Sequence, residues 1–452
     1  MGAHGAEGLM TNDAKTVLTA GKTFLSLGLE RRDLLRAGAG AAATLAAARV
    51  LAPSGVFAQG AGPETTKAKL GFIALTDAGP LFVAKEKGLF DKYGMTDVEV
   101  AKQSSWGTTR DNIVLGSGGG GIDGAHILTP MPYLITTGAM TQNNRPTEMY
   151  ILGRLNVAGQ CISVGQEYAD LKLGVDTKPF KPALEAKKAS GKEVKAAMTF
   201  PGGTHDLWIR YWLAAGGVDP NKDIQTIVVP PAQMVANMKV GTMDCFCVCE
   251  PWNEQLKNQK IGYTALTTGE LWNKHPEKAF ALRADYVEKN PKAAKALLMA
   301  VMEAQQWCEK MENKEELAAI CAKRNWIGAP VSDTVARMKG TFDYGAGKPV
   351  VENSPHIMHY WADNAGYPYK SHDLWFITED MRWGYLPSTT DAKALVEKVN
   401  REDLWRDAAK DLGVSDVPTS TSRGRETFFD GKVFDPEDPM AYLASLEIKN
   451  AA

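Results

Sequence analysis

Two strand-to-helix turns carry side chains that suit a small anion. The first, SSWGTTRD, contains Trp106, and the second, FPGGTHDLW, contains Thr204 and His205. A helix start offers free backbone N–H groups and the positive end of the helix dipole, which attract anions. Thr204 is a predicted N-cap, and His205 can donate from a ring nitrogen. Core packing of Trp106 and a capping or surface role for His205 are the alternatives.

Three further positions are less distinctive when each is taken alone. Pro231 lies in VVPPAQMV, where a strand pattern ends and proline stiffens the chain because it cannot continue a ladder. Lys278 lies in HPEKAF just before a strand pattern, and the alternative for it is a solvent-exposed lysine. Gln160 lies in VAGQCISV and has no distinguishing feature in isolation.

Cysteines alternate with other residues in the stretch MDCFCVCEPW. On a strand, Cys245, Cys247 and Cys249 would share one face. No histidine pair accompanies them, so we predict buried small apolar side chains rather than a metal site. Six cysteines in 452 residues do not form a disulfide scaffold.

Short strand patterns and helix patterns alternate from about Lys67 onward. This order predicts parallel sheets covered by helices on both faces. After about residue 312 the pattern is mostly helical and rich in aromatic residues. The glycine run in GGGGIDGAHI lacks the lysine and Ser/Thr of a phosphate loop, so we interpret it as close packing of backbone.

The order of these patterns suggests two lobes, the first of which is built from two separate stretches of the chain. We expect the first lobe over 65–154 and again over 266–452, where it includes a helical C-terminal extension. The second lobe is expected over 155–265. Such a chain would form two halves on a hinge with a ligand cleft between them.

Residues 1–58 have the pattern of a cleavable export signal. Paired arginines, Arg31 and Arg32, precede an Ala/Gly-rich stretch that ends in the A-x-A-like sequence Val56-Phe57-Ala58. The twin arginine indicates the twin-arginine export route and a periplasmic protein. The stretch is too weakly apolar to span a membrane. A disordered tail or an amphipathic helix is the alternative.

Composition excludes several classes of partner. The formal net charge of −2 implies no nucleic-acid partner, and 23% charged residues is ordinary for a soluble globular protein. An acidic body does not attract anions from a distance, so local donors must hold any anion that binds.

The sequence resembles the nitrate-binding proteins of bacterial ABC importers, within the nitrate/bicarbonate group of periplasmic solute-binding proteins. The likeness runs from about Thr65 to the C-terminus. Its longest segments are EKGLFDKYGMTDVEVAKQSSWGTTRDN, GGGIDGAHILTPMPYLIT, WIRYWLAAGGVDP, GTMDCFCVCEPW and YPYKSHDLWF. The resemblance implies an α/β fold, a two-lobed type II-like clamp with mixed parallel sheets flanked by helices.

The resemblance also implies a site and its partners. The residues that match the family's nitrate ligands are Trp106, Gln160, His205, Pro231 and Lys278. We expect a monomer that binds nitrate, or nitrite, and delivers it to a membrane permease. We expect no cofactor, no bound metal and no enzymatic activity.

Nitrate suits these residue types because it is flat, singly charged and able only to accept hydrogen bonds. Indole, imidazole, amide and ammonium groups all supply donors, and Lys278 would supply the compensating charge. In the bicarbonate-binding relatives the resemblance implies an acidic residue at position 278. A bicarbonate-binding protein and a cytoplasmic nitrate sensor of the same fold are the alternatives. A pyrimidine-synthase-like enzyme is a third, which no nucleophile–base pair supports.

Overall fold

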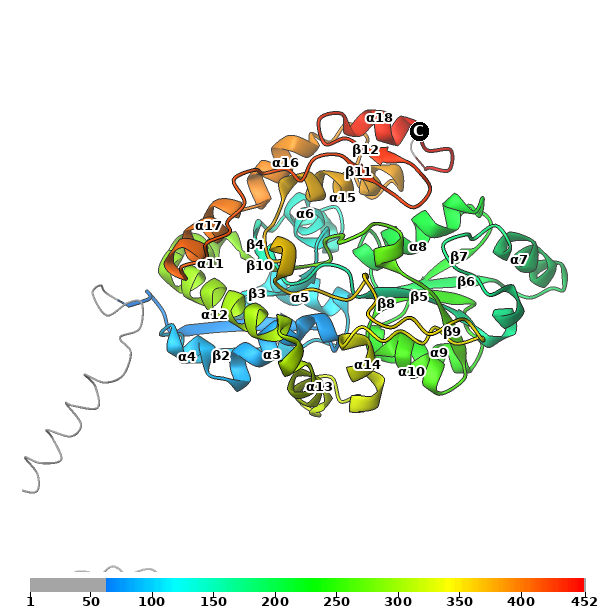
Figure 1. Cartoon of the computed structure of the whole chain (residues 1–452). Helices are drawn as coiled ribbons and strands as arrows, with labels where there is room; N and C mark the ends of the chain where they lie inside the picture. The colour runs from blue at the N-terminus through cyan, green and yellow to red at the C-terminus, as the bar shows by residue number, and fades with distance from the viewer. Residues whose placement is uncertain (1–61, 451–452) are drawn as a thin grey trace, which may run out of the picture. The chain divides into compact units, whose positions relative to one another are not determined.

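The apolar strand patterns after Lys67 build two five-stranded sheets (Figure 1). The computed structural model describes residues 62–450, so the predicted export signal over 1–58 lies outside the described residues. No helix between 62 and 450 is both long enough and apolar enough to cross a membrane.

The first sheet has the strand order β2-β1-β3-β10-β4. Its strands are β1 (Lys67–Phe72), β2 (Asp97–Lys102), β3 (Gly124–Leu128), β4 (Met149–Arg154) and β10 (Lys278–Arg283). β1 runs parallel to β2 and to β3. β10, which returns from the second sheet, runs antiparallel to both of its neighbours.

The second sheet has the strand order β7-β6-β8-β5-β9. Its strands are β5 (Gln160–Gly165), β6 (Lys195–Met198), β7 (Gln225–Val228), β8 (Cys245–Cys249) and β9 (Gly262–Thr267). β6 pairs in parallel with β7 and β8, whereas β5 is antiparallel to β8 and β9. The sheets are therefore mixed, because the strands by which the chain changes sheets run against their neighbours. The sequence analysis did not identify β9.

Helices follow most strands, as the alternation predicted. Before residue 260 they are α3 (Gly79–Glu86), α4 (Leu89–Lys92), α5 (Trp106–Leu115), α6 (Met131–Thr137), α7 (Phe180–Ala189), α8 (Thr204–Ala215), α9 (Met234–Lys239) and α10 (Trp252–Asn258). The long helix α12 (Pro291–Glu309) follows α11 (Ala284–Lys289) and packs on α3.

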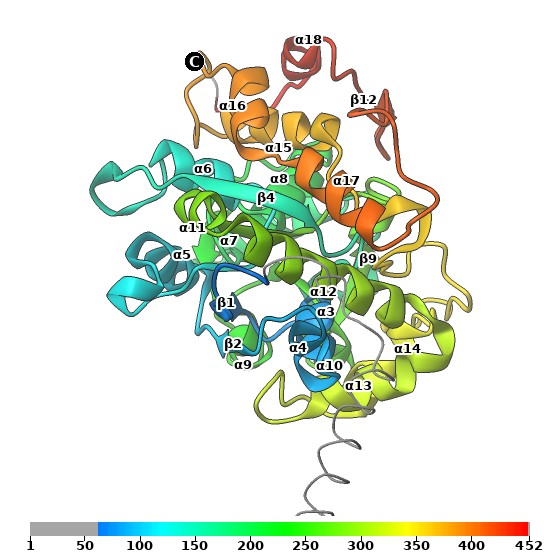
Figure 2. The same cartoon turned by 90° about the vertical axis from the view of Figure 1, so that its left-hand side faces the viewer.

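The predicted helical C-terminal region is confirmed. It contains α13 (Lys314–Ala322), α14 (Val335–Met338), α15 (Lys370–Arg382), α16 (Ala392–Val399), α17 (Glu402–Asp411), a hairpin of β11 (Glu426–Thr427) and β12 (Val433–Phe434), and α18 (Pro439–Ala444). Figure 2 shows α15, α16 and α17 beside β4, and α16 and α17 both contact that strand.

Helix α15 contacts elements that flank both sheets. Its Asp373 pairs with Arg154 at the end of β4, and both side chains are buried. Its Trp375 stacks on Trp208 of α8, with ring centroids 4.9 Å apart. This packing fixes the first turn of α8 from behind, which matters because that turn carries His205.

Two predictions about unusual stretches are confirmed. A Cβ atom at Gly121 would lie 2.0 Å from the carbonyl oxygen of Asn112, and one at Gly124 would lie 2.5 Å from that of Ala281. The glycine run therefore does permit close backbone packing. The three cysteines of β8 are fully buried, and none forms a disulfide.

Candidate functional site

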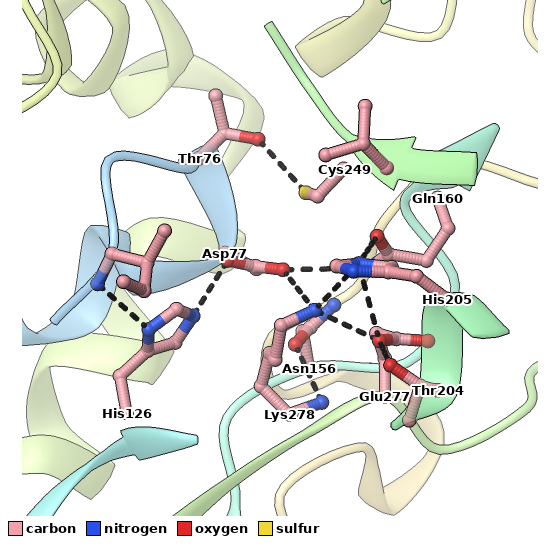
Figure 3. Close-up of polar contacts among 12 residues, drawn as sticks. Thr76, Asp77, His126, Asn156, Gln160, Thr204, His205, Cys249, Glu277 and Lys278 are labelled. Atoms are coloured by element: carbon pink, nitrogen blue, oxygen red, sulfur yellow. Dashed lines mark hydrogen bonds and ion pairs between the residues drawn. The ribbon is translucent and has the colours of Figure 1, made fainter. Parts of the chain in front are cut away.

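Five segments bring polar side chains together where the two sheets adjoin (Figure 3). Asp77 lies in the 3-10 turn η1 (Thr76–Ala78) after β1, and His126 lies on β3. Lys278 begins β10, Gln160 begins β5 and His205 is in the first turn of α8. All five side chains have no solvent exposure. The structure thus joins three of the predicted ligand residues with two acidic or basic groups that the sequence analysis missed.

Lys278 is the centre of this cluster. Its ammonium nitrogen lies 2.8 Å from Asp77 Oδ2 and 2.8 Å from Glu277 Oε1. Its remaining close neighbour is His205 Nε2, at a long 3.4 Å. An ammonium has three N–H donors, so two serve carboxylates and the third points to the region around His205. The solvent-exposed alternative for Lys278 is therefore wrong.

Asp77 receives donors from three sides. His126 Nε2 lies 2.7 Å from Asp77 Oδ1, and Gln160 Nε2 donates to Asp77 Oδ2 at 3.3 Å. The backbone N–H of Ile73 donates to His126 Nδ1, so the imidazole hydrogen is on Nε2 and points to Asp77. Burial opposes ionisation of Asp77, but the charge of Lys278 and the hydrogen bond from His126 outweigh it and lower the pKa of Asp77.

Glu277 is the second carboxylate on Lys278 and is also fully buried. Thr204 donates its hydroxyl to Glu277 Oε1, and Trp208 Nε1 donates to Glu277 Oε2 at 3.0 Å. The prediction that Thr204 caps α8 is wrong: Gly203 is the N-cap residue, and Thr204 is already helical. The reason is that a buried carboxylate competes successfully for the threonine hydroxyl.

His205 lies between two side chains that can accept a hydrogen bond. Its Nε2 is 2.7 Å from Gln160 Oε1, and its Nδ1 contacts the hydroxyl of Thr199. Burial, and then the positive charge of Lys278, hold the pKa of His205 well below its usual value. The imidazole is therefore neutral here. Neither a capping role nor a surface position describes it.

Trp106 begins α5, where Ser105 caps the helix by accepting from the backbone N–H of Thr108. The indole has no solvent exposure, and its ring centroid lies 5.9 Å from the Lys278 ammonium. Its Nε1–H has no hydrogen-bond partner among residues 62–450. A tryptophan that only filled the core would leave this donor unsatisfied at a cost in free energy. The indole N–H is thus a buried, unpartnered donor at the edge of the cluster.

Pro231 begins the buried 3-10 turn η5 (Pro231–Gln233) after β7. None of the hydrogen bonds, ion pairs or ring contacts of the cluster within residues 62–450 involves it. Its role as a ligand residue stays a prediction.

The charge balance differs from the one expected from the sequence. Lys278 was expected to hold a free positive charge for an anion, but two ionisable acids already pair with it. Burial raises the pKa of Glu277, although the charge of Lys278 acts in the opposite direction. The pKa of Lys278 is also raised, because the charges of Asp77 and Glu277 outweigh the effect of burial. Glu277 could have been found from its position next to Lys278, and Asp77 from its place in a strand-to-helix turn.

The fold and this buried polar cluster are those of a solute-binding protein. A crystal structure of the periplasmic nitrate-binding protein NrtA from Synechocystis is 64% identical, has a TM-score of 0.84 and covers 86% of this chain and 100% of its own. The chain belongs to the NMT1-like family, whose model matches residues 61–322.

Two relatives are similar to this chain over most of their length. The chain is 65% identical over 390 residues to the nitrate/nitrite binding protein NrtA of Synechocystis sp., which covers 86% of each chain. It is 46% identical over 398 residues to the bicarbonate-binding protein CmpA of Synechococcus elongatus, covering 86% of this chain and 88% of that protein.

Proposed function

We propose that this protein captures nitrate in the Lys278 cluster and delivers it, unchanged, to an ABC importer. The observation that carries the proposal is a set of buried donors with spare capacity. Trp106 Nε1 has no partner among residues 62–450, and the third N–H of Lys278 has only the long contact to His205. Buried donors of this kind are unfavourable unless an acceptor joins them.

Nitrate matches this set because it has three acceptor oxygens, no hydrogen and a flat shape. The ammonium of Lys278 and the indole N–H would donate to its oxygens, and the faces of aromatic rings would pack on its plane. The residues we propose as ligand-binding are Trp106, Gln160, His205, Pro231 and Lys278. Nitrite has the same charge and similar acceptors, so we propose it as a second ligand.

Bicarbonate is the second candidate, because Asp77 and Glu277 are carboxylates that could accept its hydrogen. Each of these carboxylates already receives donors from at least three groups. Such a shell favours an ion that brings only acceptors. The higher identity to a nitrate/nitrite binding protein supports the same choice.

Calorimetry on the full chain tests the ligand. Sodium nitrate should give saturable heat with one site per chain, and sodium bicarbonate and sodium sulfate at the same ionic strength should give none. Heat with bicarbonate but not with nitrate would favour bicarbonate as the ligand. If no anion gives heat, the proposal that this protein binds an anion is wrong.

We further propose that residues 1–58 are a twin-arginine signal and that the processed monomer acts in the periplasm. The paired arginines and the similarity to a periplasmic protein support this. Exchange of Arg31 and Arg32 for lysine should keep the full-length chain in the cytoplasm, whereas the exported parent should begin at Gln59. Full-length parent in the cytoplasm would favour a sensor.

The lobe boundaries also remain a proposal: 65–154 with 266–452 on one side and 155–265 on the other. The order of the strands supports them, since β5 to β9 all pair within the second sheet. Small-angle scattering should show a smaller radius of gyration with nitrate than without it if the two lobes close on the ligand. An unchanged radius would argue against hinged lobes.

A further inference from the structure

The cluster around Lys278 contains more acid than base. Asp77 and Glu277 both contact the Lys278 ammonium at 2.8 Å, and no other lysine or arginine within residues 62–450 forms an ion pair with either acid. With the imidazoles neutral, the formal charge of this buried group is −1. The proposed function adds a second negative charge to it. Burial of a like charge beside uncompensated carboxylate is strongly unfavourable.

A proton taken up with the anion would restore the balance, and the hydrogen bonds show where it can go. His126 cannot hold it, because the Ile73 N–H points at His126 Nδ1 and that nitrogen must stay bare. Asp77 is surrounded by donors from His126, Gln160 and Lys278, which suit an ionised carboxylate. Glu277 is also surrounded by donors: its Oε1 accepts from Lys278 and from the Thr204 hydroxyl, and its Oε2 accepts from the Trp208 N–H.

His205 differs from Asp77, Glu277 and His126 in that each of its two ring nitrogens faces a group able to accept a hydrogen bond. Its Nε2 faces the oxygen of Gln160, and its Nδ1 faces the hydroxyl of Thr199, which can also accept. Both ring nitrogens can therefore carry hydrogen once the third N–H of Lys278, 3.4 Å from Nε2, turns to the anion. We propose that the site takes up its anion together with one proton and that His205 carries this proton. The inference rests on the proposed function, since it needs an anion at this site.

The charged groups that face His205 from the surrounding elements agree with this assignment. Lys278 on β10 lies 3.4 Å away and Glu277 lies 3.8 Å away, while Asp77 and His126 act from a greater distance. On β8, burial raises the pKa of the Cys247 and Cys249 thiols, which therefore stay neutral. On the chain before β10, burial lowers the pKa of His275 to about 3, so it stays neutral as well.

The sign of the pH dependence follows from these neighbours. Burial and Lys278 lower the pKa of His205, so the imidazole is neutral at pH 7. An anion in contact with the ring raises that pKa, because it favours the imidazolium. At a pH between the pKa of His205 in the free protein and its pKa in the anion complex, the protein gains one proton on binding. In that range the affinity for the anion falls by about tenfold for each unit by which the pH rises.

Calorimetry in two buffers of different ionisation enthalpy, HEPES and Tris, measures the proton number directly. For the full chain at pH 7.5 we expect uptake of about one proton per nitrate. Nitrate heat that is identical in both buffers after correction would overturn the inference and leave the proposed function intact. Absence of nitrate heat would overturn both. His359→Gln, far from the cluster in the chain and paired with Glu309, is the control and should keep the proton number.

A second measurement locates the proton. In protein labelled with ¹⁵N at histidine, nitrate should convert one neutral ring signal to the imidazolium pattern, and that signal should be missing in His205→Gln. His205→Gln should also bind nitrate more weakly and without proton uptake. If the parent takes up a proton while every histidine signal stays neutral, the proton is on a carboxylate and His205 is not the carrier. Glu277→Gln would then lose the uptake.

Discussion

Strands β5 and β8 carry two buried charge clusters on their opposite faces, and the two clusters are built differently. Neighbouring residues divide between them: Gln160 contacts the Lys278 cluster, and Cys161 contacts Arg337. At the end of β8, Cys249 lies beside Thr76, the neighbour of Asp77, whereas Glu250, which follows the strand, pairs with Arg337. The same two strands thus serve both clusters, so differences between them arise from the side chains.

The Arg337 cluster is saturated. Its guanidinium donates to Glu250, to Glu254 at 2.7 Å and to Thr264 at 2.9 Å, and Lys257 adds a second positive charge at 2.8 Å from Glu254. Two cations thus face two buried glutamates, and Lys257 also pairs with the partly exposed carboxylate of Asp343 at 3.2 Å. A planar guanidinium with fixed donors is suited to such permanent contacts. This cluster stabilises the fold, and each nitrogen of its guanidinium already has a partner.

The Lys278 cluster is neither saturated nor balanced. One ammonium faces two carboxylates, and a spare N–H remains near an imidazole and an unpartnered indole. A compact ammonium with rotatable donors can exchange partners more readily than a guanidinium. Spare donors and an unmatched buried charge, rather than burial or ion pairing as such, therefore distinguish the proposed binding cluster from the structural one.

The largest effect should come from the structural cluster. Arg337→Met leaves Glu250 and Glu254 buried with only Lys257 for compensation, and should destabilise the protein by about 3–5 kcal/mol. Urea unfolding followed by circular dichroism measures this loss. Lys67→Ala, which breaks an exposed pair with Asp97, is the control and should change stability by less than about 1 kcal/mol. Similar losses of stability in both variants would contradict a special role of the Arg337 cluster in stabilising the fold.

Next in size is the loss of ligand affinity in Lys278→Met. Removal of the central ammonium should weaken nitrate binding by about 2–5 kcal/mol, because a buried charged donor is lost and two acids are left unpaired. Lys257→Met is the matched control, since Lys257 also contacts two carboxylates but belongs to the other cluster. Calorimetry should find its nitrate affinity unchanged. Equal losses of nitrate affinity in both variants would mean that the Lys278 ammonium affects binding only by stabilising the folded protein.

A smaller effect of opposite sign is expected for Glu277→Gln. The amide keeps the shape and an acceptor for Trp208 but removes one negative charge beside the anion. Nitrate affinity at pH 8 should rise by about 1–2 kcal/mol, as expected for a charge several ångströms away in a medium of intermediate dielectric. Glu254→Gln in the structural cluster should leave affinity unchanged. Weaker binding in Glu277→Gln would show that the acid helps to hold the ligand.

The smallest effect concerns a single N–H. Trp106→Phe keeps most of the ring but removes the unpartnered donor, and should weaken nitrate binding by about 1 kcal/mol. Trp106→Ala removes the ring as well and should weaken it further. If the phenylalanine variant binds as tightly as the parent, the indole N–H does not reach the ligand. If the alanine variant does so too, Trp106 is only part of the core.

The sequence predicted the fold better than the site. Alternation of apolar patterns located most strands and helices, because burial of each strand imposes its composition. β9 was missed because it follows a helix end without a clear turn signal and pairs only with the distant β5. The antiparallel pairings of β5 and β10 depend on where the chain changes sheets, which local patterns do not encode.

The site residues were found through resemblance, and their electrostatics were not found at all. Lys278, taken alone, resembled an exposed lysine, although its side chain is fully buried. Asp77 and Glu277 were missed because acidic residues are almost never fully buried unless paired, and the pairing of Asp77 with Lys278 joins distant parts of the chain. Only tertiary structure shows that one base serves two acids.

The complete burial of the Lys278 cluster has a kinetic consequence. A solute cannot reach side chains that have no solvent exposure, so binding and release both require a fluctuation that parts the surrounding elements. In rapid mixing, the observed association rate should therefore level off at high solute concentration, at the speed of that opening. A bound ion would leave at a rate set by this opening rather than by the strength of its own contacts.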